Sequence, residues 1–312
     1  MKRLSQAVDD YLALRRGLGF KLRFFEVYLH EFVSFLEEHG TSHITSRLAM
    51  EYATQHQDQK PVSWRRRYCI IRGFARYRFG TDPETEIPPV GLLRFRSQRV
   101  KPYLYSENEI RGLLEAALKM KCRFGRELQP YTYYCLFGLL AVTGLRLGEA
   151  MKLQPQDVDL SEGVLTIREA KFGKSRLVPL HPSTCAVLRD YVKRRDRVLA
   201  ERSITHFFMT GRGAKLDKAH LTEIFHKLSR QIGIRKPGMR HGPRLHDFRH
   251  RFAIETLLRW YRNGEQVNRC MPVLSTYLGH GSVRGTYWYL GSTPELMTAA
   301  SKLIESRWKG VV

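Results

Sequence analysis

Residues 131–150 read YTYYCLFGLLAVTGLRLGEA, a stretch in which apolar side chains prevail. Positions 131–142 are apolar on all sides of a helix, which is the pattern of a helix buried on every face. A second helical pattern covers 147–153 and ends before Pro155, because proline cannot continue a helix. The stretch therefore predicts two helices at the centre of a domain, with Arg146 where they meet.

The patterns around this stretch complete the same domain. Ser106 and Glu109 have the spacing of a helix-capping box, and an apolar helical face follows them. Short apolar runs predict a small antiparallel sheet with strands at 158–160, 164–167 and 176–180, and helical patterns return at 188–192, 221–232 and 246–260. A last helix is predicted to start at Ser292-Thr293-Pro294-Glu295, with an apolar stripe of Leu296, Ala300, Leu303, Ile304 and Trp308.

The first part of the chain has a helical pattern of its own. Apolar spacing predicts two helices before Gly40, a short third helix after Thr45 and a fourth from Val62. Prolines between Ile87 and Pro102 favour an extended path. We therefore predict a helical domain at 1–86, a basic linker at 87–104 and a second domain at 105–312. The fold class is mainly α, with an all-helical N-terminal domain and an α+β second domain that contains a small three-stranded antiparallel sheet.

The charge of the chain indicates a polyanionic partner. Its 312 residues carry 53 Lys and Arg against 30 Asp and Glu, a formal net charge of +23 with a pI near 10.1. Nucleic acid is the partner that such a balance favours. A membrane surface also attracts basic proteins, but there is no membrane-spanning apolar run, signal-peptide pattern or lipidation motif. We expect a soluble intracellular protein that binds no membrane.

The sequence gives no sign of a cofactor. Its five cysteines lie far apart and include no Cys-x-x-Cys pair, so they are expected to be reduced thiols. There is no His/Cys cluster at metal-ligand spacing and no glycine-rich phosphate loop of the Walker type. We therefore expect chemistry that needs neither a metal nor another cofactor.

Basic side chains concentrate on the fourth helix and in the linker. No acidic residue occurs from Gln59 to Thr81, and the apolar stripe of this helix should pack while its basic side faces out. Such a charge run could be a solvated helix face, but the positive charge of both domains favours DNA. The side chains predicted to bind DNA are Arg65, Arg66, Arg67, Arg72 and Arg76 on the helix, Arg94, Arg96, Arg99 and Lys101 in the linker, and Lys174 in the turn before the third strand.

A set of residues spread through the second domain has the chemistry to act on a phosphodiester: Arg146, His246, Arg249, His280 and Tyr289. Guanidinium groups can grip the phosphate bidentately, imidazoles can hydrogen-bond it or move a proton, and a tyrosine hydroxyl can attack phosphorus. A free tyrosine has a pKa of about 10, so neighbouring charge or a base must favour the phenolate. Singly, each residue has a plainer explanation: Arg146 with Glu149 could be a structural ion pair, and Tyr289 a core residue. Their joint occurrence favours function.

These residues resemble the tyrosine recombinase family, the phage-integrase-like enzymes that break and rejoin DNA. Residues 143–150 are similar to the family's first arginine box, and His246-Asp247-Phe248-Arg249-His250 is similar to its His-x-x-Arg box. Leu278-Gly279-His280 precedes Tyr289 at the family's interval of nine residues, and Lys171 matches its mobile lysine. The resemblance covers roughly 102–289. The first hundred residues resemble the family's core-binding (SAM-like) domain by helical pattern and basicity.

The resemblance implies a role for each residue. Arg146 and Arg249 would bind the non-bridging oxygens of the scissile phosphate, while His246 and His280 would hydrogen-bond it or move a proton. Lys171 would protonate the departing 5′ oxygen, and Glu149 would orient Arg146 or His246 without reacting. Tyr289 would be the nucleophile, leaving a 3′-phosphotyrosine and a free 5′-hydroxyl.

Three features depart from the family's pattern. Phe248 stands where leucine is usual, a conservative change in an apolar position. The segment 264–278 is a few residues longer, with Cys270-Met271-Pro272 inserted, so the helix that leads to His280 could be placed differently. Tyr287 is a second tyrosine close to the predicted nucleophile. We prefer Tyr289 because the interval from His280 matches.

The resemblance further implies a site-specific recombinase or integrase of a mobile element, because a chain of this length without an additional N-terminal module resembles transposon members and simple integrases. It would act on duplex DNA at specific recombination sites, as a homodimer that assembles into a synaptic tetramer, alone or beside sister recombinases. The C-terminal helix would be exchanged between subunits, and the setting would be the bacterial cytoplasm, at the nucleoid. Two alternatives remain: strand relaxation like that of a type IB topoisomerase, and a non-catalytic DNA-binding protein of the same fold.

Overall fold

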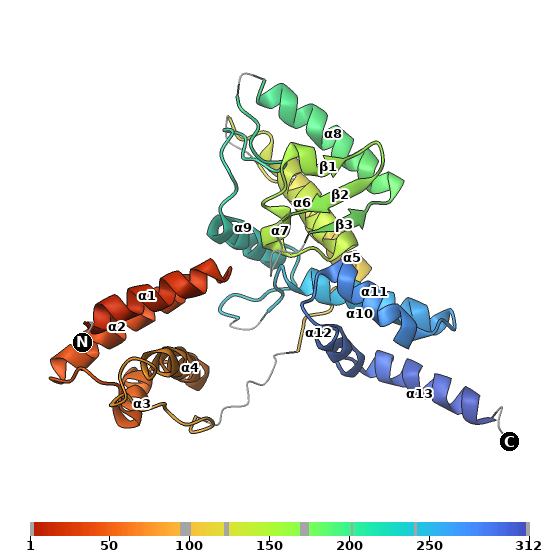
Figure 1. The fold of residues 1–312 in the computed structure, drawn as a ribbon. Coiled ribbons are helices and arrows are strands. Elements are labelled where there is room, and N and C mark those ends of the chain that lie inside the picture. Colours follow the sequence, from red (N-terminus) through yellow and green to blue (C-terminus); the bar gives the residue numbers. More distant parts are fainter. Residues whose placement is uncertain are drawn as a thin grey trace. The chain divides into compact units, whose positions relative to one another are not determined.

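The computed structural model describes residues 3–93, 101–121, 125–168, 175–200, 202–239 and 242–309. The chain divides into two compact units, Met1–Val100 and Lys101–Val312, and the boundary lies inside the segment 87–104. Helices dominate both units and the second also contains a small sheet (Figure 1), so the predicted fold class is confirmed. None of the helices in the described ranges is long and apolar enough to span a membrane.

The first unit is built from helices that pack around one apolar core. They are α1 (Leu4–Gly17), α2 (Arg23–Glu38), α3 (Ser46–Thr54) and α4 (Pro61–Arg78). Thr45 caps α3, because its Oγ1 accepts the N–H of Leu48 at 3.2 Å. Proline at the first position of α4 costs no hydrogen bond, since that N–H has no partner inside a helix. Fully buried side chains such as Phe32 and Phe74 fill the space between the helices.

The second unit contains the remaining elements. In chain order these are α5 (Glu107–Leu118), α6 (Gln129–Thr143), α7 (Leu147–Ala150), η1 (Pro155–Asp157), β1 (Val158–Asp159), β2 (Val164–Ile167), β3 (Arg176–Pro179), α8 (Pro182–Val198), α9 (Lys218–Gln231), α10 (Asp247–Arg262), α11 (Val267–Leu278), α12 (Arg284–Tyr287), η3 (Trp288–Gly291) and α13 (Pro294–Lys309). The predicted capping box starts α5. Ser106 Oγ accepts the N–H of Glu109 at 3.2 Å, and the Glu109 carboxylate accepts the N–H of Ser106 at 2.7 Å.

The sheet has the predicted antiparallel arrangement, in the order β1-β2-β3. Leu165 in β2 lies opposite Val158 in β1 and Val178 in β3. Leu165 and Val178 are buried, whereas Leu177, on the other face, is 65% exposed. This alternation follows from the strand period of two and turns one face of the sheet towards the core.

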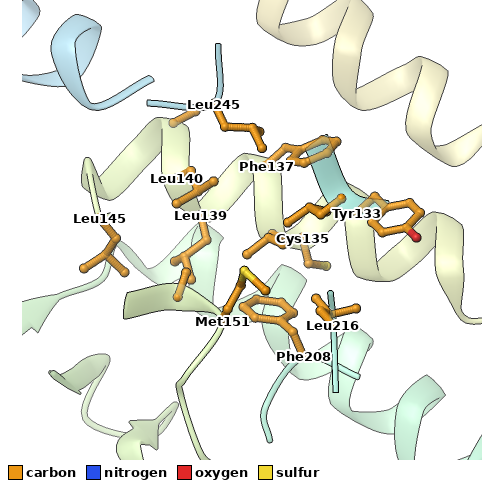
Figure 2. Packing of buried hydrophobic residues seen from close by; sticks show 14 of the residues in the cluster. Tyr133, Cys135, Phe137, Leu139, Leu140, Leu145, Met151, Phe208, Leu216 and Leu245 are labelled. Carbon is orange, nitrogen blue, oxygen red and sulfur yellow. The ribbon is translucent and has the colours of Figure 1, made fainter. Parts of the chain in front are cut away.

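The core of the second unit forms around α6, which is buried on nearly all sides as its sequence predicted. Helices α5, α8 and α10 pack against it. Figure 2 shows Tyr133, Cys135 and Phe137 of α6 in the same cluster as Met151, Phe208 and Leu216. The Phe137 ring lies 6.1 Å from that of Tyr133 and 5.9 Å from that of Phe225. These contacts hold α6 in place, and Arg146 lies just beyond the C-terminal end of this helix.

Two predicted helices differ from those in the structure. The helix predicted over 147–153 is the single turn α7, because the chain then leaves the helix and the Leu153 carbonyl accepts the N–H of Phe207 at 2.7 Å. The helix predicted over 188–192 is the middle of the longer α8, whose exposed polar turns carry little apolar signal. The long segment before His280 forms α11, with Pro272 inside the helix.

Replacing Phe137 by alanine should strongly destabilise the second unit. The substitution opens a cavity at a fully buried aromatic position, so we expect the free energy of unfolding to fall by about 3–5 kcal/mol. Urea unfolding followed by fluorescence measures the change. Val142→Ala is the matched control on the same helix, because Val142 is 52% exposed and its loss should matter by less than about 0.5 kcal/mol. Equal effects of the two substitutions would contradict the proposed role of α6.

Candidate active site

Arg146 is placed by a sharp turn at the end of α6. Gly144 ends this helix in the left-handed conformation, with φ at 62°, and Arg146 becomes the residue that precedes α7. A Cβ at position 144 would lie 2.7 Å from Cδ1 of Phe252, so both the conformation and the space require glycine. The turn directs the Arg146 side chain to the surface of the unit, where 27% of it is exposed.

Glu149 joins two arginines. Its Oε1 accepts a hydrogen bond from Nη1 of Arg146 at 2.7 Å, and its Oε2 accepts one from Nη2 of Arg176 at 2.8 Å. The Arg146 backbone N–H also donates to Oε2 at 3.0 Å. Burial acts to raise the pKa of Glu149, but the hydrogen bonds from Arg176 and Arg146 outweigh it and lower that pKa to about 2. Glu149 is therefore a carboxylate at neutral pH.

The C-terminal end of α11 holds three guanidinium groups. The carbonyls of Tyr277, Leu278 and Gly279 accept hydrogen bonds from Nε of Arg176 at 2.7 Å, Nη2 of Arg249 at 2.5 Å and Nη2 of Arg146 at 2.8 Å, respectively. Carbonyls at a helix C-terminus have no partner within the helix, and they form the negative end of its dipole. They are therefore suited to fix cations. This end of α11 brings Arg146 and Arg249 together, although they are distant in sequence.

Arg249 is almost completely buried, with 2% of its surface exposed. Its Nη1 also donates to the Gly144 carbonyl at 2.9 Å. Burial and, after it, the nearby charge of Arg146 lower the pKa of Arg249 to about 10. The Arg249 guanidinium remains protonated at neutral pH. The site therefore keeps two positively charged guanidinium groups, those of Arg146 and Arg249, next to each other.

The start of α10 is fixed by buried polar and aromatic contacts. Asp247 is completely buried and accepts hydrogen bonds from the backbone N–H of Arg244 at 2.9 Å and from its Nη2 at 2.8 Å. The Tyr105 ring stacks on that of Phe248 with 4.6 Å between centroids. The phenylalanine that replaces the expected leucine is thus used in packing. These contacts determine where His246 and Arg249 emerge from the helix.

The histidines of the site are neutral at neutral pH. Burial, followed by the charges of Arg249 and Arg146, lowers the pKa of His280 to about 4. Its Nδ1 lies 2.7 Å from Oγ1 of the buried Thr286, which fixes the ring. Burial also lowers the pKa of His250 to about 4, with His246 adding to the effect. The pKa of His246 is lowered by the protein atoms around it and by Arg249, although its side chain reaches solvent.

Tyr289 lies next to two of these histidines, His250 and His280. Its side chain is 2% exposed, and its ring centroid lies 5.6 Å from that of His250 and 6.2 Å from that of His280. It also acts electrostatically on Arg249. Tyr287, in contrast, is 45% exposed. The structure therefore brings Tyr289, and not its neighbour, against the histidines and the buried arginine.

A cleft of about 660 Å³ adjoins these residues and is lined by Arg146, Glu149 and His246. Its walls also carry four basic side chains: Lys152, Arg168, Lys218 and Arg244. Such a lining favours anionic groups over cationic ones. The cleft can therefore receive a strongly anionic chain beside the cluster of arginines.

The predicted DNA-binding residues have different surroundings. Arg65, Arg66 and Arg76 of α4 and Lys101 are exposed, while Arg72 is half-buried and donates to the Pro88 carbonyl at 2.9 Å. The prediction that the basic side of α4 faces out is wrong for Arg67, which is 5% exposed. Its Nη2 donates to Gln59 at 2.9 Å and its guanidinium lies over the Tyr28 ring, so internal contacts use this side chain. The predicted residues Lys171, Lys174, Arg94, Arg96 and Arg99 lie outside the described residues.

Sequence reasoning missed Arg176 and gave no role to Asp247, His250 or Thr286. Arg176 opens a strand-like run in which a charged residue is unremarkable. Its partners are Glu149 in α7 and the Tyr277 carbonyl in α11, and both lie in other elements. Asp247 and His250 lie within the segment 246–250 that contains the His-x-x-Arg motif, so the sequence already indicated that they are close to the site. The position of Thr286 depends on the short helix α12, which the periodicity does not predict.

One group of potential metal ligands lies together within the described ranges, in the first unit: His43, Asp82 and Glu84. Asp82 accepts a hydrogen bond from Thr85 at 2.9 Å and is paired with the buried Arg78. His43 lies 3.0 Å from Glu84. Contacts among protein side chains therefore account for this cluster.

Comparison with known proteins identifies relatives along the whole chain. Residues 104–295 match the model of the phage integrase family. A Sinorhizobium fredii protein provisionally named integrase/recombinase y4rB is 53% identical over 311 residues, which are 99% of each chain. The tyrosine recombinase XerD of Bifidobacterium longum is 25% identical over 95% of this chain and 94% of its own. The Tn1549 transposon integrase, solved in complex with transposon right end DNA, has a similar fold, with a TM-score of 0.69 at 14% identity over 98% of this chain and 99% of that chain.

The ionised Glu149 should make stability depend on acid pH. Its folded-state pKa of about 2 lies below its ordinary value of 4.5, so its contribution is present above about pH 4.5 and is lost as pH falls towards 2. Between about pH 6 and about pH 3 the wild-type protein should lose about 2 kcal/mol more stability than Glu149→Gln. Urea unfolding at the two pH values measures this difference. Glu162→Gln, in an exposed turn, is the control and should keep the wild-type loss; the same loss in Glu149→Gln would contradict the assignment.

Proposed function

Because the chain belongs to the phage integrase family, the tyrosine recombinases, we propose that it breaks and rejoins duplex DNA at specific sites through a 3′-phosphotyrosine formed by Tyr289. The observation that carries this proposal is the position of Tyr289. It lies against His280 and His250 and close enough to Arg249 for an electrostatic effect. Arg146 and His246 of the same site line a basic cleft. A base or a cation beside a phenol can activate its oxygen for attack on a phosphodiester.

Arg146 and Arg249 would bind the non-bridging oxygens of the scissile phosphate. A guanidinium has five N–H donors. In each arginine, both terminal nitrogens (Nη1 and Nη2) donate a hydrogen bond to an oxygen of the protein, and this fixes the plane of the guanidinium group. Each of these nitrogens carries a second hydrogen that can be donated to a phosphate. Preorganised donors of this kind stabilise charge that develops in the transition state, and each is typically worth about 10²–10³ in rate.

The remaining roles concern protons. The Tyr289 oxygen forms a bond to phosphorus while the bond from phosphorus to the 5′ oxygen breaks. His246 or His280 takes up the phenolic proton or hydrogen-bonds the phosphate, since both are neutral in the free protein. Lys171 supplies the proton of the 5′-hydroxyl. Glu149 keeps Arg146 oriented and does not react.

The reaction needs no external energy source. One phosphodiester replaces another, so cleavage is close to isoenergetic and the covalent intermediate retains the bond energy for rejoining. Attack by the free 5′-hydroxyl of a second strand on the phosphotyrosine reverses the same step. Strand exchange between two duplexes would therefore need only repeated cleavage and rejoining by the same reaction at the same kind of site.

We assign DNA contacts outside the reaction centre to basic side chains that reach solvent. On the first unit these are Arg65, Arg66 and Arg76, and beyond it Lys101, with Arg72 restrained by its bond to Pro88. Arg94, Arg96, Arg99 and Lys174 keep their predicted role, whereas Arg67 is excluded because it is buried. Residues 1–86 would then act as a DNA-binding domain, 87–104 as a basic linker and 105–312 as the catalytic domain.

The biological setting we propose is a mobile element of a bacterium, with chromosomal DNA as the partner and the nucleoid as the location. The enzyme would act as a synaptic multimer. The first turns of α13 pack against their own subunit, because Leu296 is buried in the same apolar cluster as Tyr289 and α13 contacts α10. Exchange between subunits would therefore involve the later part of this helix, from about Ala300 onward.

A covalent adduct tests the catalytic proposal. Wild-type protein mixed with nicked duplexes from the DNA that flanks the encoding element should give a denaturant-resistant protein–DNA adduct, with tyrosine 289 attached to a 3′ phosphate. Tyr289→Phe should bind the same DNA and form none, whereas Tyr287→Phe is the matched control and should react normally. No adduct with wild type would favour a non-catalytic DNA-binding protein. Relaxation of supercoils without synapsis would favour topoisomerase-like activity.

Truncation after Ala300 tests the role of the last helix. It keeps Leu296 and the core around Tyr289, so the truncated protein should still form the adduct on single duplexes. Cooperative assembly on paired sites, measured by gel shift and by light scattering, should be lost. Assembly that persists unchanged would rule out exchange of this segment.

A further inference from the structure

Arg176 connects three parts of the active site from a buried position. Its side chain is 8% exposed. Nη2 and Nη1 donate to the two oxygens of Glu149, at 2.8 and 3.2 Å, and Nε donates to the Tyr277 carbonyl at 2.7 Å. The first residue of β3 is thereby hydrogen-bonded both to the carboxylate of Glu149 in α7 and to the end of α11.

The turn that leads to His280 is built around the same side chain. Gly279 has φ at 64°, and a Cβ at this position would lie 2.7 Å from Nη1 of Arg176. The guanidinium therefore occupies the space next to Gly279, whose carbonyl in turn accepts a hydrogen bond from Arg146. A movement of the Arg176 side chain would therefore change the position of the backbone at Gly279 and of His280, which follows it.

Arg176 also limits how strongly Glu149 binds Arg146. A carboxylate and a guanidinium prefer a bidentate pair. Here Arg176 takes that bidentate place, and the Arg146 side chain makes a single bond to Oε1. With Arg176 absent, Glu149 could pair fully with Arg146 and withdraw donors that a phosphate would use. The balance of charges in the cluster, three arginines to one carboxylate, would also become less positive.

We propose that Arg176 is a positioning residue for DNA cleavage: it occupies Glu149 and supports the Gly279 turn, so that Arg146 keeps free donors for the scissile phosphate. This inference rests on the proposed function. Arg176 does not touch DNA itself, because it lies beneath Gly279 and is almost completely covered. Its effect is therefore on the rate of the chemical step and not on the affinity for DNA.

The test compares Arg176→Gln with a buried arginine elsewhere in the same unit. Arg195 in α8 is 4% exposed and has the same kinds of partner, the carboxylate of Asp196 at 2.8 Å and the Phe207 carbonyl at 3.0 Å. Arg195→Gln should lower thermal stability to a similar extent. At saturating DNA, the single-turnover rate of adduct formation should fall about 10- to 100-fold in Arg176→Gln and stay at the wild-type level in Arg195→Gln. DNA affinity should be unchanged in both.

A double-mutant cycle then shows whether Arg176 acts through Glu149. Arg176→Gln should slow the Glu149→Gln protein much less than it slows wild type, because the carboxylate that it restrains is already neutral. Arg176→Lys should fold and retain part of the rate, since one ammonium cannot hold both Glu149 oxygens and the Tyr277 carbonyl.

Equal slowing by Arg176→Gln in both backgrounds, or an unchanged rate, would overturn the inference while wild-type adduct formation still upheld the proposed function. Loss of DNA affinity in Arg176→Gln would also overturn it. If wild type itself forms no adduct, the proposed function and the inference both fail.

Discussion

The active site depends on how one helix ends. The N–H groups of Gly279 and His280 fold back onto the Thr276 and Ser275 carbonyls, each at 2.9 Å, which closes α11 with a glycine in the left-handed conformation. The next three carbonyls then point away from the helix and accept hydrogen bonds from three arginines of different elements. This end of α11 therefore gives the turn after α6, the start of α10 and the third strand a common point of attachment.

This arrangement leaves the site with unbalanced positive charge. Buried cations are costly unless they are paired, and Glu149 is the carboxylate that pairs with Arg146 and Arg176. Carbonyl oxygens supply the remaining partners, so the guanidinium groups are hydrogen-bonded without being neutralised. Burial is the main cause of the lowered pKa values of Arg249 and His280, and the neighbouring positive charges act in the same direction. A phosphate that enters the cleft meets charge that the protein itself has not compensated.

The proposed nucleophile, Tyr289, is held mainly by apolar contacts. Tyr289 packs in a small cluster with Leu278 of α11 and Leu296 of α13, apart from the large core around α6. Its position is therefore set by the same helix end that fixes the arginines and by the first turns of the last helix. This links the chemistry to the C-terminal helix, because a change in how α13 packs would move the ring that carries the attacking oxygen.

The sequence by itself determined most of the elements and indicated the groups that we propose to react. Periodicity gave most of the helices and the three strands. Motif order brought Arg146, Arg249, His280 and Tyr289 into one hypothesis, because local spacing and residue chemistry suffice for such statements. The tertiary structure alone decided that Arg67 is internal, that the helix after Arg146 lasts one turn, and that Arg176 belongs to the site. These facts depend on contacts between segments far apart in the chain, such as Arg176 with Tyr277. A charged residue carries no local sign of the carbonyl or carboxylate that the fold will place beside it.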